Sequence, residues 1–182
     1  MTDKESVSIS KYMSFILRHH PERAGITLDS NGWADVAELI ASMSKPGRVA
    51  VTLEDIQYVV ANNDKQRFAF NDDLTKIRAN QGHSIPVDVQ LKEAEPPDTL
   101  FHGTSKGAVQ GILENGIVPK QRLYVHLSGD EQTALKVGQR HGKPIVLEID
   151  AEKMVVDGYK FYLSENNVWL TNIVPVAYIR QS

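Results

Sequence analysis

The stretch Leu91-Lys92-Glu93-Ala94-Glu95-Pro96-Pro97-Asp98 divides this chain of 182 residues into two parts with different patterns. Proline fixes its own φ angle and disfavours a helical conformation in the residue before it, so the Pro-Pro pair favours an extended connection. We therefore expect two domains, residues 1–95 and residues 96–182, joined at this linker. Each would have about 90 residues, which is enough for a small hydrophobic core.

The first part has the pattern of helices followed by a hairpin. Thr52 and Asp55 have the spacing of a capping box, which predicts the start of a helix. Phe68 and Phe70 alternate before Asn71-Asp72-Asp73, and Leu74 and Ile77 follow, which predicts a β-hairpin. Three helices and a hairpin are the pattern of a winged helix. Apolar residues at helical spacing predict the other two helices, the first ended by Pro21: Ile9, Tyr12, Met13, Ile16 and Leu17, then Val36, Leu39, Ile40 and Met43.

The second part is richer in strands. We expect a helix from about Ser105 to Asn115 with Gly116 at its C-cap, and another from about Asp130 to Arg140. This mixture predicts a small α+β domain, and the whole chain is expected to be α+β. The runs with β propensity are Thr99–Phe101, Tyr124–Leu127, Pro144–Ile149, Val168–Thr171 and Val174–Ile179.

The composition excludes several classes of protein. The chain has 20 Lys and Arg against 23 Asp and Glu, a net charge of −3, so it does not coat nucleic acid by bulk attraction. It has no cysteine, which excludes a disulfide framework, a thiolate nucleophile and a zinc site built on cysteine. The N-terminal residues lack the apolar core of a signal peptide, and no stretch approaches the roughly 20 apolar residues of a membrane span. We expect a soluble, cytoplasmic protein.

Arg18-His19-His20 is the first candidate for chemistry, at the end of the first predicted helix. Cations at this position interact favourably with the helix macrodipole, which is a sufficient structural explanation. Alternatively, the planar guanidinium of Arg18 binds a phosphate, and His19 beside it acts as an acid or base. Lys65-Gln66-Arg67 precedes the predicted hairpin, and a solvated turn is a sufficient explanation for these residues taken alone.

His102-Gly103-Thr104-Ser105 is expected where the first strand of the second domain meets its first helix. A glycine there would let a ligand approach the backbone, and Thr104 or Ser105 would cap the helix. Arg122, Tyr124 and His126 would share one face of a strand. The six histidines have neither HxH nor HExxH spacing, so we expect no metal site. The absence of a GxGxxG or Walker motif argues against a Rossmann or P-loop nucleotide site.

Taken in order, these motifs resemble the RNA 2′-phosphotransferase family over roughly Ser8 to Ile179. Each motif alone is weak, but chance is a poor explanation for seven in the same order. The motifs of the first part are Ser14–Pro21, Leu28-Asp29 with Gly32-Trp33, Asn63–Phe68, and Ile77–Ala79 with Gln81–Ser84. Those of the second part are His102–Thr104, Arg122 with Val125–Ser128, and Ser164 with Asn166 and Val168–Leu170.

The resemblance implies an N-terminal winged-helix-like lobe for RNA and phosphate, residues 1–95, and a C-terminal NAD-binding lobe that resembles ADP-ribosyltransferases, residues 96–182. It implies removal of an internal 2′-phosphate from RNA, with NAD⁺ as co-substrate and no metal. The products would be 2′-hydroxyl RNA, nicotinamide and ADP-ribose 1″,2″-cyclic phosphate, formed through an ADP-ribosylated RNA. Spliced tRNA is the family's substrate in eukaryotes and fungi. We expect a monomer.

The resemblance also assigns roles to residues. The family's catalytic residues fall on Arg18, His19, Arg67 and Arg122. Two positions depart from the family pattern: Lys120, where methionine is expected, and Asn167, where glycine is common. Asparagine tolerates a positive φ better than most residues, so the turn is expected to survive. The positions implied to bind NAD are His102, Gly103, Thr104, His126, Leu127, Ser128, Ser164 and Asn166.

Two other functions are compatible with the sequence. One is an NAD-dependent ADP-ribosyltransferase that modifies nucleic-acid phosphates and stops at the ADP-ribosylated nucleic acid. Detection of the cyclic phosphate product would exclude this function. The other is a winged-helix RNA- or DNA-binding module without catalysis. The distinctive arginines are spread over both expected lobes, which favours an enzyme over a module that binds through one exposed helix.

Overall fold

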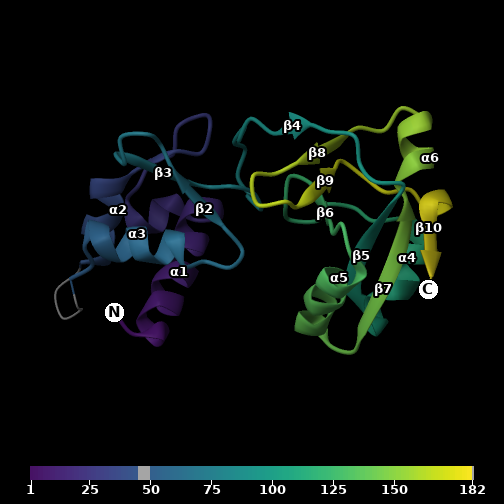
Figure 1. Cartoon of the computed structure of the whole chain (residues 1–182), viewed down its shortest axis with the longest axis horizontal. Coiled ribbons are helices and arrows are strands. Elements are labelled where there is room, and N and C mark those ends of the chain that lie inside the picture. Colours follow the sequence, from purple (N-terminus) through teal and green to yellow (C-terminus); the bar gives the residue numbers. More distant parts are fainter. Residues whose placement is uncertain (45–49, 182) are drawn as a thin grey trace. The chain divides into compact units, whose positions relative to one another are not determined.

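The computed structural model describes residues 1–44 and 50–181, and it divides into two compact units, Met1–Gln90 and Leu91–Ser182 (Figure 1). Both units combine short helices with small antiparallel sheets. The predicted α+β class is therefore confirmed. No helix in the described ranges is long and apolar enough to cross a membrane.

The first unit contains three α-helices that begin at side-chain caps. Helix α1 spans Asp3–Arg18, helix α2 spans Val36–Met43 and helix α3 spans Leu53–Ala61. Asp35 caps α2, and the Thr52–Asp55 capping box predicted from the sequence starts α3. A similar box of Thr2 and Glu5 starts α1 earlier than its apolar stripe indicates. These caps satisfy backbone N–H groups that have no partner within the helix.

A three-stranded antiparallel sheet completes the first unit. Strands β1 (Ala34–Asp35), β2 (Phe68–Phe70) and β3 (Lys76–Ala79) are arranged in the order β1-β3-β2. The predicted hairpin is confirmed, because Phe68 pairs with Ala79 and Phe70 with Ile77. Leu74 was expected to alternate with Ile77 but lies in the turn, with φ of +60°.

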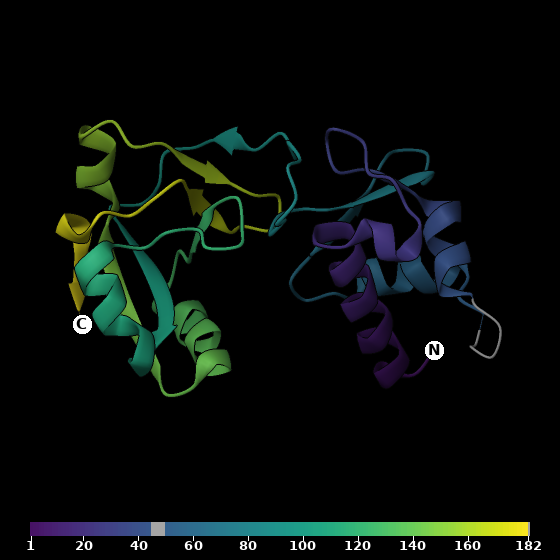
Figure 2. The ribbon, with the colours of Figure 1, turned by 180° about the vertical axis from the view of Figure 1, so that it is seen from behind.

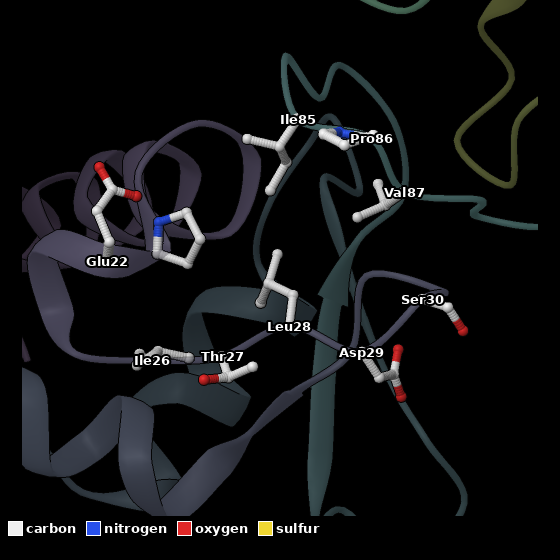
Figure 3. A pocket seen from close by; sticks show the side chains of 10 residues that line it. Glu22, Ile26, Thr27, Leu28, Asp29, Ser30, Ile85, Pro86 and Val87 are labelled. Atoms are coloured by element: carbon white, nitrogen blue, oxygen red, sulfur yellow. The ribbon is translucent and has the colours of Figure 1, made fainter.

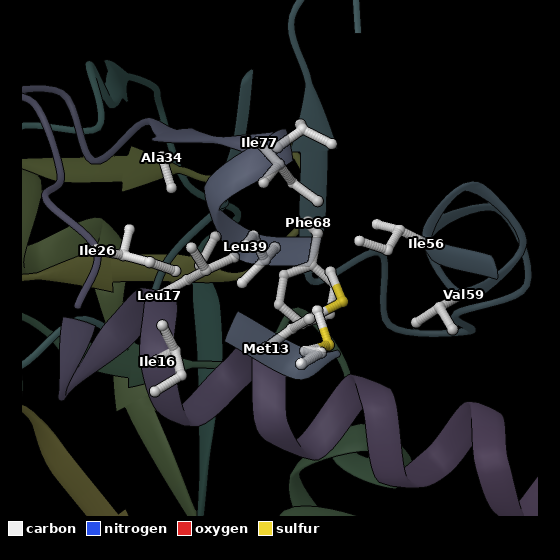
Figure 4. Close-up of a cluster of buried hydrophobic side chains, with 13 residues drawn as sticks. Met13, Ile16, Leu17, Ile26, Ala34, Leu39, Ile56, Val59, Phe68 and Ile77 are labelled. Carbon is white, nitrogen blue, oxygen red and sulfur yellow. The ribbon is translucent and has the colours of Figure 1, made fainter. Parts of the chain in front are cut away.

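The hydrophobic core of the first unit fixes the C-terminal half of α1 (Figure 4). Met13, Ile16 and Leu17 of this helix are each at most 1% exposed. Full burial of a large apolar side chain stabilises a fold by about 1.5–3 kcal/mol, so these residues hold the helix firmly in place. Arg18 and His19 follow these residues directly, so the core also fixes the position of their backbone. The buried α1 residues share one core with side chains of the other two helices and of the sheet: Leu39 of α2, Ile56 and Val59 of α3, Phe68 of β2 and Ile77 of β3.

The second unit is built on two antiparallel sheets (Figure 2). Their strand orders are β10-β7-β5 and β4-β8-β9-β6. Backbone hydrogen bonds of 2.8 and 2.9 Å between Phe101 and Ser128 join β5 to the end of β6. The strands are β4 (Lys92–Glu93), β5 (Thr99–Ser105), β6 (Val125–Leu127), β7 (Pro144–Asp150), β8 (Phe161–Leu163), β9 (Trp169–Thr171) and β10 (Ile179–Gln181). The helices are α4 (Lys106–Asn115), α5 (Glu131–Gly138) and α6 (Ala151–Val156).

Several predicted boundaries in the second part differ from the structure. The units divide after Gln90 rather than after Glu95, because Lys92–Glu93 pairs with β8 and so belongs to the second unit. The expected strand Val174–Ile179 is wrong: Val174 forms a single bridge with Ile117, and a 3₁₀ turn follows before β10. Helix α5 ends at Gly138, and the next residues form a 3₁₀ turn. Helix α6 and strand β8 were not predicted, because neither exceeds six residues and each gives little periodicity.

Candidate active site

Arg18 and His19 lie at the C-terminal end of α1. His19 is the C-cap residue, and its backbone N–H donates to the Phe15 carbonyl at 3.2 Å. Pro21 begins a short 3₁₀ turn directly afterwards, so the helix ends where the sequence predicts. Both side chains are half-buried. A guanidinium and an imidazole are thus presented together at the end of a helix that the core fixes.

The loop Gln81–Ser84 contacts both residues of this pair. The Ser84 hydroxyl lies 2.9 Å from Nδ1 of His19, and the Ser84 backbone N–H donates to the Arg18 carbonyl at 3.0 Å. Gly82 has φ of +90°, which favours glycine, and a Cβ there would meet the Arg18 guanidinium carbon at 3.6 Å. The residues alone predict only a surface loop here, and the family resemblance is what singled it out.

His83 in the same loop is only 2% exposed. Burial, together with the smaller effect of the positive charges of Arg18, His19 and Arg78, lowers the pKa of its imidazole to about 4. The side chain is therefore neutral at physiological pH. Its Nε2 atom is buried, with no hydrogen-bond partner in the part of the chain that the structure describes. His83 thus anchors the loop beside Arg18 without adding a charge.

Arg67 is linked to the same loop through the backbone. The Asn80 N–H donates to the Arg67 carbonyl at 2.9 Å, only a few residues before Ser84 contacts Arg18. The Arg67 guanidinium donates to the Asn63 side chain at 2.9 Å, and Asn63 donates to Ser10 of α1 at 3.1 Å. Burial lowers the pKa of Arg67, although an arginine stays charged at neutral pH. The first unit therefore orients two candidate phosphate-binding cations.

Arg78 is a further cation near this site; it belongs to the Ile77–Ala79 motif, but the sequence indicated no role for it. Its guanidinium carbon lies 4.5 Å from the centroid of the Trp33 ring, and the side chain is 8% exposed. A cation above an indole face is stabilised by the ring quadrupole. The Gly32-Trp33 motif in the sequence carries no charge, so it does not indicate that Trp33 contacts Arg78.

A cavity of about 380 Å³ lies next to these residues in the first unit (Figure 3). The two carboxylates in its lining already have partners in the protein. Glu22 pairs with His20 at 3.0 Å, and Asp29 accepts from the backbone N–H groups of Asn31 and Trp33 at 2.9 and 3.0 Å. The carboxylates would repel a phosphate, so we do not assign the phosphate site to this cavity. The remaining lining is largely apolar: Pro21, Ile26, Thr27, Leu28, Ser30, Ile85, Pro86 and Val87.

In the second unit, backbone carbonyl groups fix the two candidate histidines. Nδ1 of His102 lies 3.2 Å from the His126 carbonyl, and Nδ1 of His126 lies 3.0 Å from the Tyr124 carbonyl. A carbonyl only accepts, so in each ring Nδ1 carries the proton and Nε2 of the neutral form is an acceptor. Burial is the main cause that lowers the pKa of His102, and the positive charges of Lys120 and His141 add to it. His102 is therefore neutral at physiological pH.

Gly103 lies inside strand β5, opposite Val146, and not at the junction of strand and helix. A Cβ at this position would overlap the carbonyl oxygen of Ala134 on α5. The glycine thus permits close packing of a helix, and the approach of a ligand at this position stays a prediction. Thr104 is buried, and Ser105 is the N-cap of α4 without a side-chain capping bond.

Arg122 lies in a bend before β6, so the prediction that it shares a strand face with Tyr124 and His126 is wrong. Strand β6 begins only at Val125, and the Arg122 N–H instead donates to the Pro119 carbonyl at 3.0 Å. The Arg122 side chain is exposed. Desolvation by nearby protein lowers its pKa, but the guanidinium remains charged and accessible to an anion.

The other positions implied to bind NAD have clear structural roles. Leu127 is a core residue, so only its backbone is available to a ligand. Ser128 forms the backbone bridge to Phe101. The Ser164 hydroxyl donates to the Asn166 side chain at 2.7 Å and accepts from the Val168 N–H at 3.0 Å, which closes the β8–β9 turn. Asn167 has φ of +58° there, so asparagine replaces glycine without losing the turn.

The comparisons with known proteins agree with these motifs. Residues 4–173 match the model of the family described as RNA 2′-phosphotransferase, Tpt1 / KptA family. The chain belongs to the RNA 2′-phosphotransferase family. A relative from Flavobacterium johnsoniae, named "Probable RNA 2′-phosphotransferase", is 52% identical over 98% of each chain. Another with the same name, from Hahella chejuensis, is 50% identical over 97% of this chain and 95% of its own length.

The RNA 2′-phosphotransferase family match covers every residue group described above. It includes Arg18 and His19, the Gln81–Ser84 loop, Arg122 and the two histidines of the second unit. No group of three or more potential metal ligands comes together among residues 1–44 and 50–181. Independence from metal stays a prediction to be tested.

Proposed function

We propose that this protein removes an internal 2′-phosphate from RNA and transfers it to NAD⁺. The products would be 2′-hydroxyl RNA, nicotinamide and ADP-ribose 1″,2″-cyclic phosphate. The observation that carries the proposal is the match to the RNA 2′-phosphotransferase family over residues 4–173. Within this range, the contact of Ser84 with both Arg18 and His19 gives a preorganised cation and acid at one helix end.

The residue types suit a phosphate substrate. A phosphate monoester is an anion at neutral pH and needs cations that hold it in a defined orientation. Arginine presents a planar fork of N–H donors that matches phosphate oxygens, and it stays charged. We assign Arg18, Arg67 and Arg122 to this task. Positioning and electrostatic stabilisation would supply most of the rate enhancement, because the phosphate is itself the nucleophile and needs no general base.

The residues of the second unit fit NAD⁺ as the second substrate. NAD⁺ supplies an electrophilic anomeric carbon, C1″, and nicotinamide as a leaving group. Its nicotinamide ring is cationic, so a charged imidazole beside it would be unfavourable. Burial keeps His102 neutral, and the His126 carbonyl fixes its ring. We propose His102, His126, Thr104 and Asn166 as groups that hold this substrate.

In the first step, one oxygen of the 2′-phosphate would form a bond to C1″. The bond from C1″ to the nicotinamide nitrogen would break, and its electron pair would neutralise the pyridinium. Arg18, Arg67 and Arg122 would hold the phosphate during this attack. No proton transfer is needed, so His19 would not act as an acid here.

In the second step, the ribose 2″-hydroxyl would attack phosphorus and lose its proton to solvent. The bond between phosphorus and the RNA 2′-oxygen would break, and that oxygen would receive a proton. An alkoxide is a poor leaving group, so a general acid is required. His19 is our candidate, because it lies beside Arg18 and its other ring nitrogen is already held by Ser84.

We further propose that the first unit is a winged-helix-like lobe for RNA and that the second resembles ADP-ribosyltransferases. The first unit has three helices and a β-hairpin, which supports the former. The bridge between β5 and β6 joins two antiparallel sheets around His102 and His126, which supports the latter. A cytoplasmic, monomeric enzyme that acts on RNA such as spliced tRNA is the corresponding cellular proposal.

One assay tests the reaction. The full chain is incubated with an oligonucleotide that carries one internal 2′-phosphate, with and without NAD⁺, and all products are resolved by mass. We expect 2′-hydroxyl RNA and ADP-ribose cyclic phosphate only when NAD⁺ is present. Accumulation of ADP-ribosylated RNA as the end product would instead identify an ADP-ribosyltransferase. Binding of the oligonucleotide without any product would identify a non-catalytic module.

A further inference from the structure

Ser84 makes two contacts that join distant parts of the chain. Its hydroxyl lies 2.9 Å from Nδ1 of His19, a residue 65 positions earlier in the sequence. Its backbone N–H donates to the carbonyl of Arg18, the neighbour of His19, at 3.0 Å. The Ser84 side chain is otherwise exposed, so this hydrogen bond is not explained by the packing of a core.

We propose that Ser84 is a positioning residue that fixes the ring of His19. The hydroxyl engages Nδ1, and we assign the transfer of a proton to the RNA 2′-oxygen to Nε2, the other ring nitrogen. This inference rests on the proposed function, in which His19 is the acid of the second step. Ser84 itself touches no reacting atom in this scheme and acts only through His19.

A hydroxyl is well suited to this task. When Nε2 gives up its proton, Nδ1 keeps its own, so the hydroxyl oxygen accepts from Nδ1–H both before and after the transfer. A carboxylate at the same place would only accept and would stabilise the charged imidazolium, which raises the pKa of a histidine. A serine therefore holds the ring in both protonation states that an acid passes through, without binding its proton more tightly.

The loop around Ser84 fixes the position of its hydroxyl. The preceding residue, His83, is 2% exposed, and Gly82 lies against the Arg18 guanidinium. The charged or titratable groups that face His19 are Arg18 on its own helix, His20 with its ring centroid 6.5 Å away, and neutral His83 from the loop. The contact that the geometry shows at Nδ1 is that of a neutral hydroxyl, which lies 2.9 Å away.

Variants of matched shape test the proposal through activity. Ser84→Thr and Ser84→Val have nearly the same volume, but only threonine keeps a hydroxyl. We expect Ser84→Val and Ser84→Ala to lower kcat about 10–100-fold with little change in KM for RNA, because an acid displaced by a fraction of an ångström is less effective. Ser84→Thr should retain most of the rate. Ser8→Ala, an exposed serine on α1, is the control and should match the unaltered protein.

The ring of His19 gives a readout that does not depend on activity. In ¹⁵N-labelled protein, the two ring nitrogens of His19, assigned with His19→Gln, report which one carries the proton. Ser84→Val should shift the Nδ1 signal and mix the tautomers, whereas Ser84→Thr should preserve the spectrum. Unchanged His19 signals in a folded Ser84→Val protein, or kcat equal to that of Ser84→Thr, would overturn the proposal. If neither the unaltered protein nor any variant acts on 2′-phosphorylated RNA, the proposed function fails. The spectra of the His19 ring nitrogens then decide alone whether Ser84 fixes this ring.

Discussion

Gly103 on β5 lies directly against the main chain of Ala134 on α5, so close that a Cβ atom on Gly103 would overlap the Ala134 carbonyl oxygen. Gly138 at the end of the same helix approaches β5 in a similar way, because a Cβ there would be 2.7 Å from the Thr104 carbonyl. Two glycines thus bring this helix into contact with the strand that carries His102. The packing of the second unit depends on the absence of side chains at these points.

We predict that Gly103→Ala destabilises the second unit. Overpacking of a well-packed interior typically costs about 1–3 kcal/mol, and here the opposing atom is backbone that cannot rotate away. The free energy of unfolding, measured with urea, should fall by at least this amount. Gly111→Ala in α4 is the control, because nothing lies within 4 Å of its Cβ position; it should leave stability unchanged or raise it by about 0.5–1 kcal/mol. A stable Gly103→Ala protein that has lost only NAD affinity would show that the glycine serves the ligand instead.

Arg18→Ala and Arg122→Ala should each abolish most dephosphorylation while the fold stays intact. Loss of a charge-assisted phosphate contact costs on the order of 2–5 kcal/mol of transition-state stabilisation. This corresponds to a fall in kcat/KM of about 30-fold or more. Arg140→Ala, which removes an exposed arginine of the second unit, should have no such effect. Near-normal turnover by a folded Arg122→Ala protein would remove Arg122 from the site.

His19→Ala should slow the second step more than the first. The first step uses the phosphate as nucleophile without an acid, whereas departure of the RNA 2′-oxygen requires one. General acids typically contribute about 10²–10⁴-fold, so ADP-ribosylated RNA should accumulate. A gel time course with labelled 2′-phosphorylated RNA and excess NAD⁺ would detect it. Equal loss of both steps would mean that His19 holds the phosphate and that the acid is another group.

The buried His83 predicts a specific dependence of stability on pH. Its pKa is about 4 in the folded protein, against about 6.5 when it is unfolded. Between these values the unfolded state binds more protons, so the free energy of unfolding should fall as pH decreases from 6.5 to 4, by up to about 3 kcal/mol. Below pH 4 both states are protonated, and this histidine causes no further change.

This pH dependence is measured by comparison with His83→Gln, which keeps a polar side chain that does not titrate. In a Trp169→Phe background, the fluorescence of Trp33 reports unfolding of the first unit alone. The difference between the two proteins should grow as pH falls through this range. His141→Gln, in the second unit, controls for the loss of one histidine. Parallel curves with and without His83 would mean that the pKa of His83 is the same in the folded and unfolded protein, which would contradict the burial of a neutral imidazole.

We predict that a chelator leaves the rate of dephosphorylation unchanged. The proposed chemistry uses arginines to stabilise charge and a cationic leaving group on NAD⁺, so it does not call for a Lewis acid. The assay compares initial rates with and without EDTA at saturating NAD⁺. Inhibition that added Mg²⁺ or Mn²⁺ reverses would refute metal independence.

Much of the first unit is predictable from local sequence. The apolar stripe of α1 together with Pro21 gives the end of that helix, and Thr52 with Asp55 gives the start of α3. These features depend on residues a few positions apart, whose interactions persist wherever the segment lies. The second unit was predicted less well, because its strands are mostly three residues long or, like Val174–Ile179, interrupted by a 3₁₀ turn.

The sequence by itself therefore determined the α+β class, the helix that carries Arg18 and His19, and the ordered motifs shared with the RNA 2′-phosphotransferase family. Only the tertiary structure showed that Ser84 holds His19, that His83 is buried and neutral, and that Gly103 meets Ala134. These contacts join residues about 30 to 65 positions apart, and such pairs meet only after the helices have packed on the sheets. Hydrogen bonding, desolvation and close packing of that kind depend on the folded surroundings of a residue and leave no periodic trace in its local sequence.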